Sequence, residues 1–399
     1  MRYGSPGGRG INCAVGFDMG VWDIIHFNEI LPGRLIRAML TPRRITNVIK
    51  AGASLLVSSL LRKPVVWGVP PVLTIEPTNL CNLRCPLCTT GAGEMERPGG
   101  RLSLDTFRRL LDLLGDHVFF LLIYHQGEPY MNKHFFDFIR LAKQKGIYVT
   151  TSTNGHFFTP ANVEKTIESG LDSMIISVDG VTQESYARYR VGGELGRVIE
   201  GIRRLLQARR RSGSRTPLVA LQFLVMRHNE EEIPRMKQLA RELGVDRFLV
   251  KTIEVRTLAE ARTWLPDREA FRRYEVRGDA FVVKGVSKKQ NCPRLWLSTL
   301  MNWDGSIVPC CFDKNGRYRV GRIHRVEDFR AIWKGEALQA FRRQHLHHRQ
   351  SIDICRNCNQ GFGNFLPTHL WQRWMQGNPP PSSRDRVSRP LAQMISDEE

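Results

Sequence analysis

Residues 81–88 read Cys81-Asn-Leu-Arg-Cys85-Pro-Leu-Cys88, and this short stretch decides how the rest of the chain is interpreted. Thiolates are soft ligands that favour iron–sulfur clusters or zinc. A closed zinc site takes four ligands and usually pairs its cysteines as two Cys-x2-Cys units, which this segment does not do. The Cys-x3-Cys-x2-Cys spacing instead offers three thiolates to a four-iron cluster and leaves the fourth iron open for chemistry.

Around this stretch, from Pro71 to about Lys251, apolar strand-like runs alternate with amphipathic helical runs. Such alternation is typical of repeated β/α units around a parallel sheet, so the predicted fold class is α/β. We expect six strands: Val72–Ile75, Val118–Tyr124, Ile147–Thr151, Ser173–Val178, Leu218–Val225 and Arg247–Lys251. The expected helices are Leu104–Leu114, His134–Lys145, Pro160–Glu168, Glu194–Arg210 and Glu230–Leu243. Ser103 is a plausible N-cap, and Gly244 is one of three glycines expected to close a helix.

Polar side chains follow several of these strands. The second strand runs into Gln126-Gly127-Glu128-Pro129, the third into Ser152-Thr153-Asn154-Gly155, and the fourth into Ser177-Val178-Asp179-Gly180. Taken alone, each of these segments is a turn. Parallel α/β barrels, however, place their chemistry at the carboxyl ends of strands, where the cysteine loop also lies. We therefore expect one site that combines these segments.

This combination of motifs resembles the radical S-adenosylmethionine (radical SAM) superfamily. The resemblance implies a partial (β/α)6 TIM-like barrel and a [4Fe-4S] cluster on Cys81, Cys85 and Cys88. It also implies S-adenosylmethionine as a second cofactor, which the open iron chelates and cleaves to a 5′-deoxyadenosyl radical.

The same resemblance suggests roles for single residues. Gly127 and Glu128 would hold the methionine amino group, although Gln126 replaces the first glycine of the family's Gly-Gly-Glu-Pro motif. Ser177 would contact the ribose, and Ser152 or Asn154 would add supporting contacts. Leu87 would lie near the adenine, and the fifth and sixth strands, at Leu221–Met226 and around Val250-Lys251, would wall the adenine with apolar side chains. No catalytic acid or base can be named.

A second group of cysteines lies near the C-terminus, in the pattern Cys292-x17-Cys310-x44-Cys355-x2-Cys358. Four thiolates can close every iron of a second [4Fe-4S] cluster, whose natural work is electron transfer. The segment resembles the SPASM and twitch extensions of radical enzymes, and its four-ligand spacing is closer to the one-cluster twitch type. A tetrahedral zinc ion would also be satisfied by these four thiolates.

Two neighbouring features of this region need a choice. Cys311 follows Cys310 directly, and two adjacent thiols rarely point at one cluster, so we take Cys310 as the ligand and Cys311 as core filler. His345, His347 and His348 lie in an Arg-rich helical stretch, which favours a solvated face over a metal site.

The lone Cys13, near the N-terminus, is interpreted as a bystander thiol in a loop.

The expected domain organisation follows from these motifs. We expect an N-terminal, partly helical extension over residues 1–70, a core barrel over 71–252 and a junction over 253–290. The auxiliary cluster domain would cover 291–361, and the C-terminal segment 362–399 would be disordered from about residue 377 because it lacks apolar content.

Composition limits the partners and the compartment. Lys and Arg number 59 against 39 Asp and Glu, a net charge of +20, but no basic face with interleaved aromatics indicates nucleic acid. Nine cysteines at metal-ligand spacings, with no signal peptide, favour a reducing, cytoplasmic location. Residues 45–61 form a basic amphipathic segment, and we expect its apolar face to pack on the barrel, with a membrane surface as the alternative.

The two cysteine groups together favour a radical SAM oxidoreductase. It would abstract a substrate hydrogen and pass the remaining electron to the auxiliary cluster, a two-electron oxidation of a small molecule. Three alternatives remain: a maturase that modifies peptides or proteins, a lipid-directed radical enzyme, and a non-enzymatic iron–sulfur or zinc scaffold. The enzyme would need an external reductant such as flavodoxin or ferredoxin.

Overall fold

The centre of the molecule is a run of six parallel strands in the order β7-β6-β5-β4-β3-β2. The structure, a computed structural model, describes residues 13–15, 31–284 and 292–358. The six strands are β2 (Val72–Ile75), β3 (Phe120–Ile123), β4 (Tyr148–Thr153), β5 (Ser173–Ser177), β6 (Leu218–Val225) and β7 (Arg247–Thr252). All six predicted strands are confirmed, with ends that differ by two residues at most.

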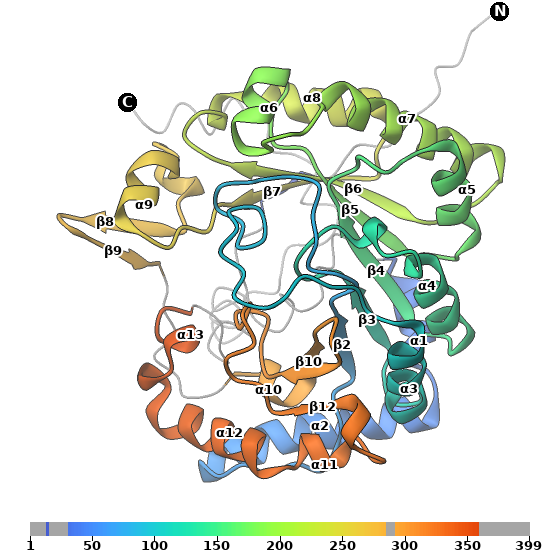
Figure 1. The fold of residues 1–399 in the computed structure, drawn as a ribbon, viewed down its shortest axis with the longest axis vertical. Coiled ribbons are helices and arrows are strands. Elements are labelled where there is room, and N and C mark those ends of the chain that lie inside the picture. Colours follow the sequence, from blue (N-terminus) through green and yellow to red (C-terminus); the bar gives the residue numbers. More distant parts are fainter. Residues whose placement is uncertain (1–12, 16–30, 285–291, 359–399) are drawn as a thin grey trace, which may run out of the picture.

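Helices cover the outer side of this curved sheet (Figure 1). They are α3 (Leu104–Leu114), α4 (Phe135–Gln144), α5 (Pro160–Glu168), α6 (Gln183–Tyr189), α7 (Leu195–Arg211) and α8 (Ile233–Leu243), with the 3-10 turns η3 (Pro129–Met131) and η4 (Glu230–Glu232). Ser103 Oγ accepts a hydrogen bond from Thr106 N at 3.1 Å and begins α3, as predicted. Gly244, with a φ of 74°, ends α8 in the left-handed conformation that glycine favours. The short α6 was not predicted.

The sheet continues beyond the barrel at both edges, which the sequence did not indicate. At one edge β1 (Cys13–Val15) pairs in parallel with β7, so the prediction that Cys13 lies in a loop is wrong. At the other edge β10 (Ser298–Met301) pairs in parallel with β2, and Ser298 lies opposite Val72. The second cysteine-bearing region therefore shares one ten-stranded sheet with the barrel.

The second region is built on a hairpin and small helices. Its elements are α10 (Arg294–Leu297), β10, β11 (Ser306–Val308), β12 (Gly321–Arg322), η6 (Ile323–Arg325), α11 (Arg330–Trp333), α12 (Glu336–His348), η7 (Arg349–Ser351) and α13 (Asp353–Arg356). The core of this region holds a fully buried arginine, Arg342, whose guanidinium lies 4.4 Å from the ring centroid of Trp333 and 5.7 Å from that of Trp296. It donates to the carbonyl oxygens of Leu295 and Trp333, at 3.0 and 2.7 Å. Burial lowers its pKa to about 9, because the charged form loses water.

The predicted junction contains ordered elements of its own. These are α9 (Leu258–Trp264), η5 (Glu269–Phe271) and the antiparallel hairpin of β8 (Tyr274–Arg277) and β9 (Ala280–Val283). The hairpin projects from the side of the molecule in Figure 1. The expected disorder from residue 377 lies outside the described residues, as does most of residues 1–30.

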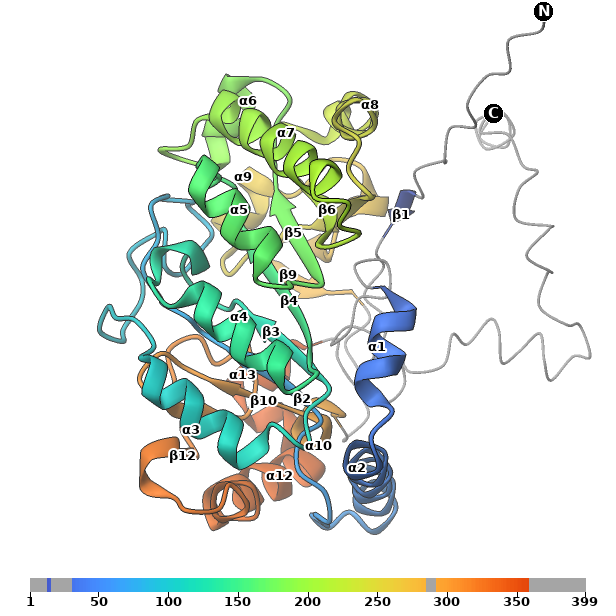
Figure 2. The ribbon, with the colours of Figure 1, turned by 90° about the vertical axis from the view of Figure 1, so that its right-hand side faces the viewer.

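Two helices precede the barrel, α1 (Pro32–Met39) and α2 (Pro42–Leu61), and they form one edge of the molecule in Figure 2. The expectation that α2 packs its apolar face on the barrel is wrong. The helix buries Arg44, Asn47, Ala51, Ser54, Leu55 and Ser58, a mostly polar and small set. Arg44 donates to four backbone carbonyl oxygens, including those of Gly115 and Gly146. The hydrogen-bonding side of α2 thus faces the protein.

Candidate active site

The cysteine loop leaves the carboxyl end of β2, as predicted. Cys85 is buried, and Cys81 and Cys88 are half-buried beside it. Burial raises the pKa of Cys81 to about 11, and the charges of Glu128, Cys85 and Cys88 raise it further. The three thiols are therefore near neighbours in an apolar setting. In such a setting, binding of a metal cation would favour their deprotonation. This donor set fits iron–sulfur ligation by soft thiolates.

Hydrogen-bond donors of the backbone and of side chains approach the cysteine sulfurs. Leu83 N lies 3.4 Å from Cys81 Sγ, and Arg190 Nη1 lies 3.8 Å from Cys85 Sγ. Among the residues that the structure describes, no three or more His, Cys, Asp or Glu side chains are placed to hold a single metal ion.

The Gly127-Glu128-Pro129 turn packs directly against the chain that leads to Cys81. Glu128 N donates to Leu80 O at 2.8 Å. Gly127 has a φ of 71°, and a Cβ there would lie 2.5 Å from the carbonyl oxygens of Thr78 and Leu80. Only glycine allows this approach of two backbones.

The side chain of Glu128 is buried and joins two strand ends. Its carboxylate accepts from Thr153 Oγ1 at 2.7 Å, Asn154 N at 2.8 Å and Tyr130 N at 3.3 Å. Burial nevertheless raises its pKa to about 7, because those donors only partly replace water. Glu128 therefore positions the third strand end, whichever contact it makes with a cofactor.

Asn154 carries that connection on to the cysteine loop. Its Nδ2 donates to Asn82 Oδ1 at 2.8 Å and lies 3.9 Å from Cys81 Sγ, so it is the strand-end amide that lies beside a cysteine. Ser152, on the same strand, is half-buried. Ser177, at the end of β5, is buried and accepts from Gln222 Nε2 at 3.5 Å.

Leu87 is buried in an apolar cluster with Tyr189, Met226 and Ile253. The latter two follow β6 and β7, the strands expected to form the adenine wall. The structure brings the predicted wall and the predicted adenine contact together.

Sequence reasoning missed the pair Asp179–Arg190. Arg190 Nε donates to Asp179 Oδ2 at 2.5 Å, and Asp179 Oδ1 accepts from Leu224 N at 2.8 Å. Arg190 ends the unpredicted helix α6 and reaches Cys85. The sequence indicated no partner for Asp179. The signal that could have found the pair is an acidic residue at the end of a strand.

The second cysteine group gathers around α10 and α13. Cys292 is buried with Leu295, Trp296 and Phe341, and Cys355 packs against this cluster. Burial raises the pKa of Cys355, and the charges of Cys292 and Cys358 add to the effect, so these three thiols lie near one another. Arg349, which was not predicted, donates to the carbonyl oxygens of Cys355 and Cys358 at 3.3 and 2.6 Å.

Cys310 and Cys311 are hydrogen-bonded to each other, and this bond raises the pKa of Cys310 and lowers that of Cys311. The charge of Cys292 acts on Cys310, whereas Glu254 and Lys314 act on Cys311.

The solvated face expected for the three histidines is correct for the exposed His347 and His348 and wrong for His345, which is buried.

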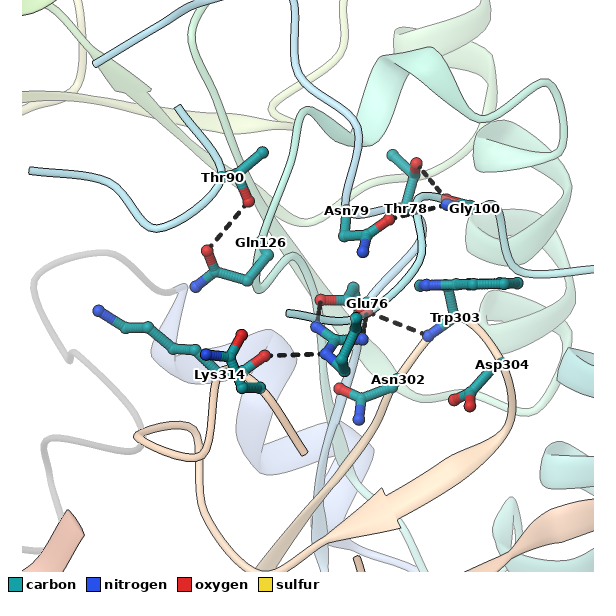
Figure 3. Close-up of polar contacts among 12 residues, drawn as sticks. Glu76, Thr78, Asn79, Thr90, Gly100, Gln126, Asn302, Trp303, Asp304 and Lys314 are labelled. Carbon is teal, nitrogen blue, oxygen red and sulfur yellow. Dashed lines mark hydrogen bonds and ion pairs between the residues drawn. The ribbon is translucent and has the colours of Figure 1, made fainter. Parts of the chain in front are cut away.

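A loop over residues 89–103 ties the two cysteine regions together (Figure 3). Arg97 forms a bidentate ion pair with Glu76, in which Nη2 lies 2.7 Å from Oε1 and Nη1 lies 2.8 Å from Oε2. Its Nε donates to the backbone carbonyl oxygen of Lys314 at 2.9 Å. Glu76, at the end of β2, also accepts from Trp303 N at 3.2 Å. Gln126 Oε1 accepts from Thr90 Oγ1 at 3.2 Å, so the unusual residue of the motif holds the start of this loop.

A cavity of about 370 Å³ lies between the two regions. Its lining includes Thr89 and Glu94 from the loop after Cys88, Glu254 and Arg256 after β7, and Phe312 and Lys314 beside Cys311. Arg256 pairs with Glu94 and with Glu260, the latter at 2.7 Å, and Lys314 lies 3.4 Å from Glu254. The cavity is therefore polar and carries charges of both signs.

Comparisons with known proteins agree with this architecture. The family model of the radical SAM superfamily matches residues 75–240, and that of the SPASM iron–sulfur cluster-binding domain matches residues 292–359. Together they span more than half of the chain.

Several curated relatives are 26 to 31% identical to this chain over the aligned residues. A tungsten-containing aldehyde ferredoxin oxidoreductase cofactor-modifying protein of Pyrococcus furiosus is 26% identical over 60% of this chain and 70% of its own length. A PqqA peptide cyclase of Ruegeria pomeroyi is 26% identical over 73% of this chain and 80% of its own. The chain spans about half the length of several other curated relatives.

Solved structures show the same fold. SuiB of Streptococcus suis, bound to S-adenosylmethionine, has a TM-score of 0.54 at 16% identity, covering 82% of this chain and 79% of SuiB. The anSMEcpe structure with bound AdoMet has a TM-score of 0.51 at 15% identity, covering 73% of this chain and 89% of that one. The chain therefore belongs to the radical SAM superfamily and is a radical SAM enzyme with a C-terminal SPASM iron–sulfur domain.

Proposed function

We propose that this enzyme removes two electrons from a polar, charge-bearing substrate held in the cavity between its two cysteine regions. Cys81, Cys85 and Cys88 would hold the [4Fe-4S] cluster that binds S-adenosylmethionine, and Cys292, Cys310, Cys355 and Cys358 an auxiliary cluster. The first cluster and S-adenosylmethionine, when bound, supply a 5′-deoxyadenosyl radical. The observation that carries the proposal is the position of the 370 Å³ cavity, lined by residues next to both cysteine groups.

The electron balance is simple. An external one-electron donor, such as flavodoxin or ferredoxin, would supply the electron that cleaves S-adenosylmethionine to methionine and the 5′-deoxyadenosyl radical at the cluster held by Cys81, Cys85 and Cys88. One substrate C–H bond would break by transfer of a hydrogen atom to that radical, which would yield 5′-deoxyadenosine. The substrate radical would then lose a proton to a base and one electron to the cluster held by the second cysteine group. The protein's contribution is to hold the substrate and keep water and side reactions out.

Within the site, we assign Gly127, Glu128 and Asn154 to the methionine end, Ser177 and Ser152 to the ribose and Leu87 to the adenine. Glu128 and Asn154 support this assignment because their hydrogen bonds join the strand ends to Asn82 in the cysteine loop. Arg256 pairs with Glu260, and Lys314 pairs with Glu254. On binding, anionic groups of the substrate would replace these glutamates as partners of Arg256 and Lys314.

A peptide is the second candidate substrate. The cavity carries both acidic and basic side chains, which suits the amide and charged groups of a peptide. In support, one relative is a PqqA peptide cyclase, and a solved structure of SuiB contains its precursor peptide SuiA. In either case the first chemical step is the same hydrogen-atom transfer.

The test is iron and sulfide analysis with electron paramagnetic resonance on anaerobically reconstituted protein, with and without S-adenosylmethionine. We expect about eight irons per chain. One cluster signal should shift on adding S-adenosylmethionine, and this shift should disappear in the Cys81/Cys85/Cys88→Ala variant. Reductive formation of 5′-deoxyadenosine should disappear with it. About four irons plus zinc would overturn the oxidation proposed here, since no second cluster would take the electron.

A further inference from the structure

Helix α2 has its hydrophobic side on the outside. Ile45, Ile49, Leu56 and Leu60 are 43%, 65%, 53% and 72% exposed. Their spacing of four, seven and four residues places them along one side of the helix. The buried residues of α2, such as Asn47, Ser54 and Ser58, lie on the opposite side and make hydrogen bonds inside the protein. We call these four exposed residues the α2 stripe.

The stripe belongs to a larger apolar surface at one end of the molecule. Ten large hydrophobic residues are exposed among the described residues, and eight of them lie between positions 36 and 67. Besides the stripe, these eight include Ile36 of α1, Leu40 at the end of that helix, Leu61, and Trp67, which is 52% exposed. Exposed apolar residues concentrated on one short segment in this way mark a contact with another body.

The charge of the same segment identifies that body. Residues 31–63 contain seven Arg and Lys and no Asp or Glu. Arg37, Lys50 and Lys63 are exposed. A helix with an apolar side bordered by cations is the form that lies in the interface of an anionic membrane. No described helix is long and apolar enough to cross a membrane.

A basic cavity adds a place for an anionic headgroup. Its volume is about 290 Å³, and its lining includes Arg43, Lys50, Trp67, His117 and Arg330. The charges of Arg43, Lys50 and Arg330 all act on His117, so the cations converge there. Two acids pair with these cations: Asp116 lies 2.5 Å from Arg43, and Asp328 lies 3.2 Å from Arg330. The cavity borders the same helix as the stripe, because Lys50 directly follows Ile49.

We propose that the α2 stripe is a membrane-docking surface for anionic phospholipids. The stripe enters the boundary between headgroups and acyl chains, and the flanking cations bind headgroup phosphates. Helix α2 then lies flat on the bilayer, with its hydrogen-bonded side still attached to the protein. The inference rests on these helices and holds whatever the substrate is.

Vesicle flotation of the full-length, reconstituted protein tests the proposal. The probes are vesicles of phosphatidylcholine alone and of phosphatidylcholine with phosphatidylglycerol. The wild type should float with the anionic vesicles, less so at high salt because salt screens the charges. The Ile49→Ser/Leu56→Ser/Leu60→Ser variant should bind at least about tenfold more weakly, since it loses the buried apolar area.

Two further variants separate the contributions. Val276→Ser/Val282→Ser removes the two other exposed apolar residues, on the β8–β9 hairpin, and should bind like the wild type. Arg37→Gln/Lys50→Gln/Lys63→Gln should lose the preference for phosphatidylglycerol. Unchanged circular dichroism and iron content of each variant would show that its fold is intact.

Three results would overturn the proposal. The first is a wild type that stays in the aqueous phase with both kinds of vesicle. The second is a folded stripe variant that still floats like the wild type. The third is a wild-type dimer on gel filtration that the stripe variant converts to a monomer, which would mean that a second copy of the chain covers the stripe.

Discussion

The two cysteine sites are held in place by opposite kinds of side chain. In the barrel, acids organise the site: Glu128 joins two strand ends, and Asp179 holds Arg190 beside Cys85. In the C-terminal domain, buried arginines do this work: Arg349 grips the carbonyl oxygens around Cys355 and Cys358, and Arg342 lies between two tryptophans. The difference teaches that one site is assembled on strand ends, while the other is assembled around buried arginines that donate to backbone carbonyl oxygens.

The sharpest way to separate the two sites is to remove each set of ligands. In the Cys292→Ala/Cys310→Ala/Cys355→Ala variant, iron should fall to about half, because only the first site still binds a cluster. Reductive cleavage of S-adenosylmethionine should stay within about twofold of wild type, since all three thiols that bind the first cluster are kept. Substrate oxidation should be lost. Loss of cleavage as well would show that the two sites depend on each other for folding.

A smaller effect is expected for the buried arginine of the second site. Arg342→Ala removes two hydrogen bonds from a cation and its contacts with Trp296 and Trp333. We expect a loss of about 3 kcal/mol in the free energy of unfolding, measured by chemical denaturation. Arg343, next in sequence and exposed, is the matched control, and Arg343→Ala should cost less than about 0.5 kcal/mol. Equal losses in the two variants would remove the structural role of Arg342.

The smallest effect concerns the acid of the first site and depends on pH. The folded-state pKa of Glu128 is about 7, above its ordinary value of 4.5, so the folded apoprotein holds this proton more tightly than the unfolded chain. This contribution to stability is complete below pH 4.5 and is lost as the pH rises through 7. Between pH 5 and 8 the wild type should lose about 2 kcal/mol relative to Glu128→Gln, which does not titrate. Denaturation of both apoproteins at several pH values checks this. Parallel stability curves would mean that Glu128 is ionised throughout.

Much of the barrel could be predicted because its information is local. Apolar runs gave the six strands, and Ser103 and Gly244 marked helix ends. The cysteine spacing and the polar residues at strand ends located the site, since topology brings those ends together. What periodicity cannot show is which partner a side chain chooses across the fold. Arg190 and Arg349 look like any other arginine in a chain rich in them.

The prediction that the apolar face of α2 packs on the barrel was wrong for a related reason. The apolar residues of this helix follow a helical pattern, and such a pattern normally points to the core. Here backbone carbonyl groups of the barrel need donors, and Arg44 and Asn47 supply them, so the polar side turns inward. Likewise, nothing local indicates that β10 pairs with β2, because their partnership spans more than 220 residues.

That partnership has a consequence for protein engineering. Since β10 lies beside β2, a barrel cut before residue 292 would expose the backbone of β2 as a bare edge, and such edges recruit other chains into aggregates. The hydrogen bond from Arg97 Nε to the backbone carbonyl oxygen of Lys314 would be lost as well. A chimera that borrows its auxiliary domain from another enzyme must therefore import a strand matched to β2, together with the partner of Arg97. The barrel and the C-terminal domain therefore have to be engineered as one structural unit.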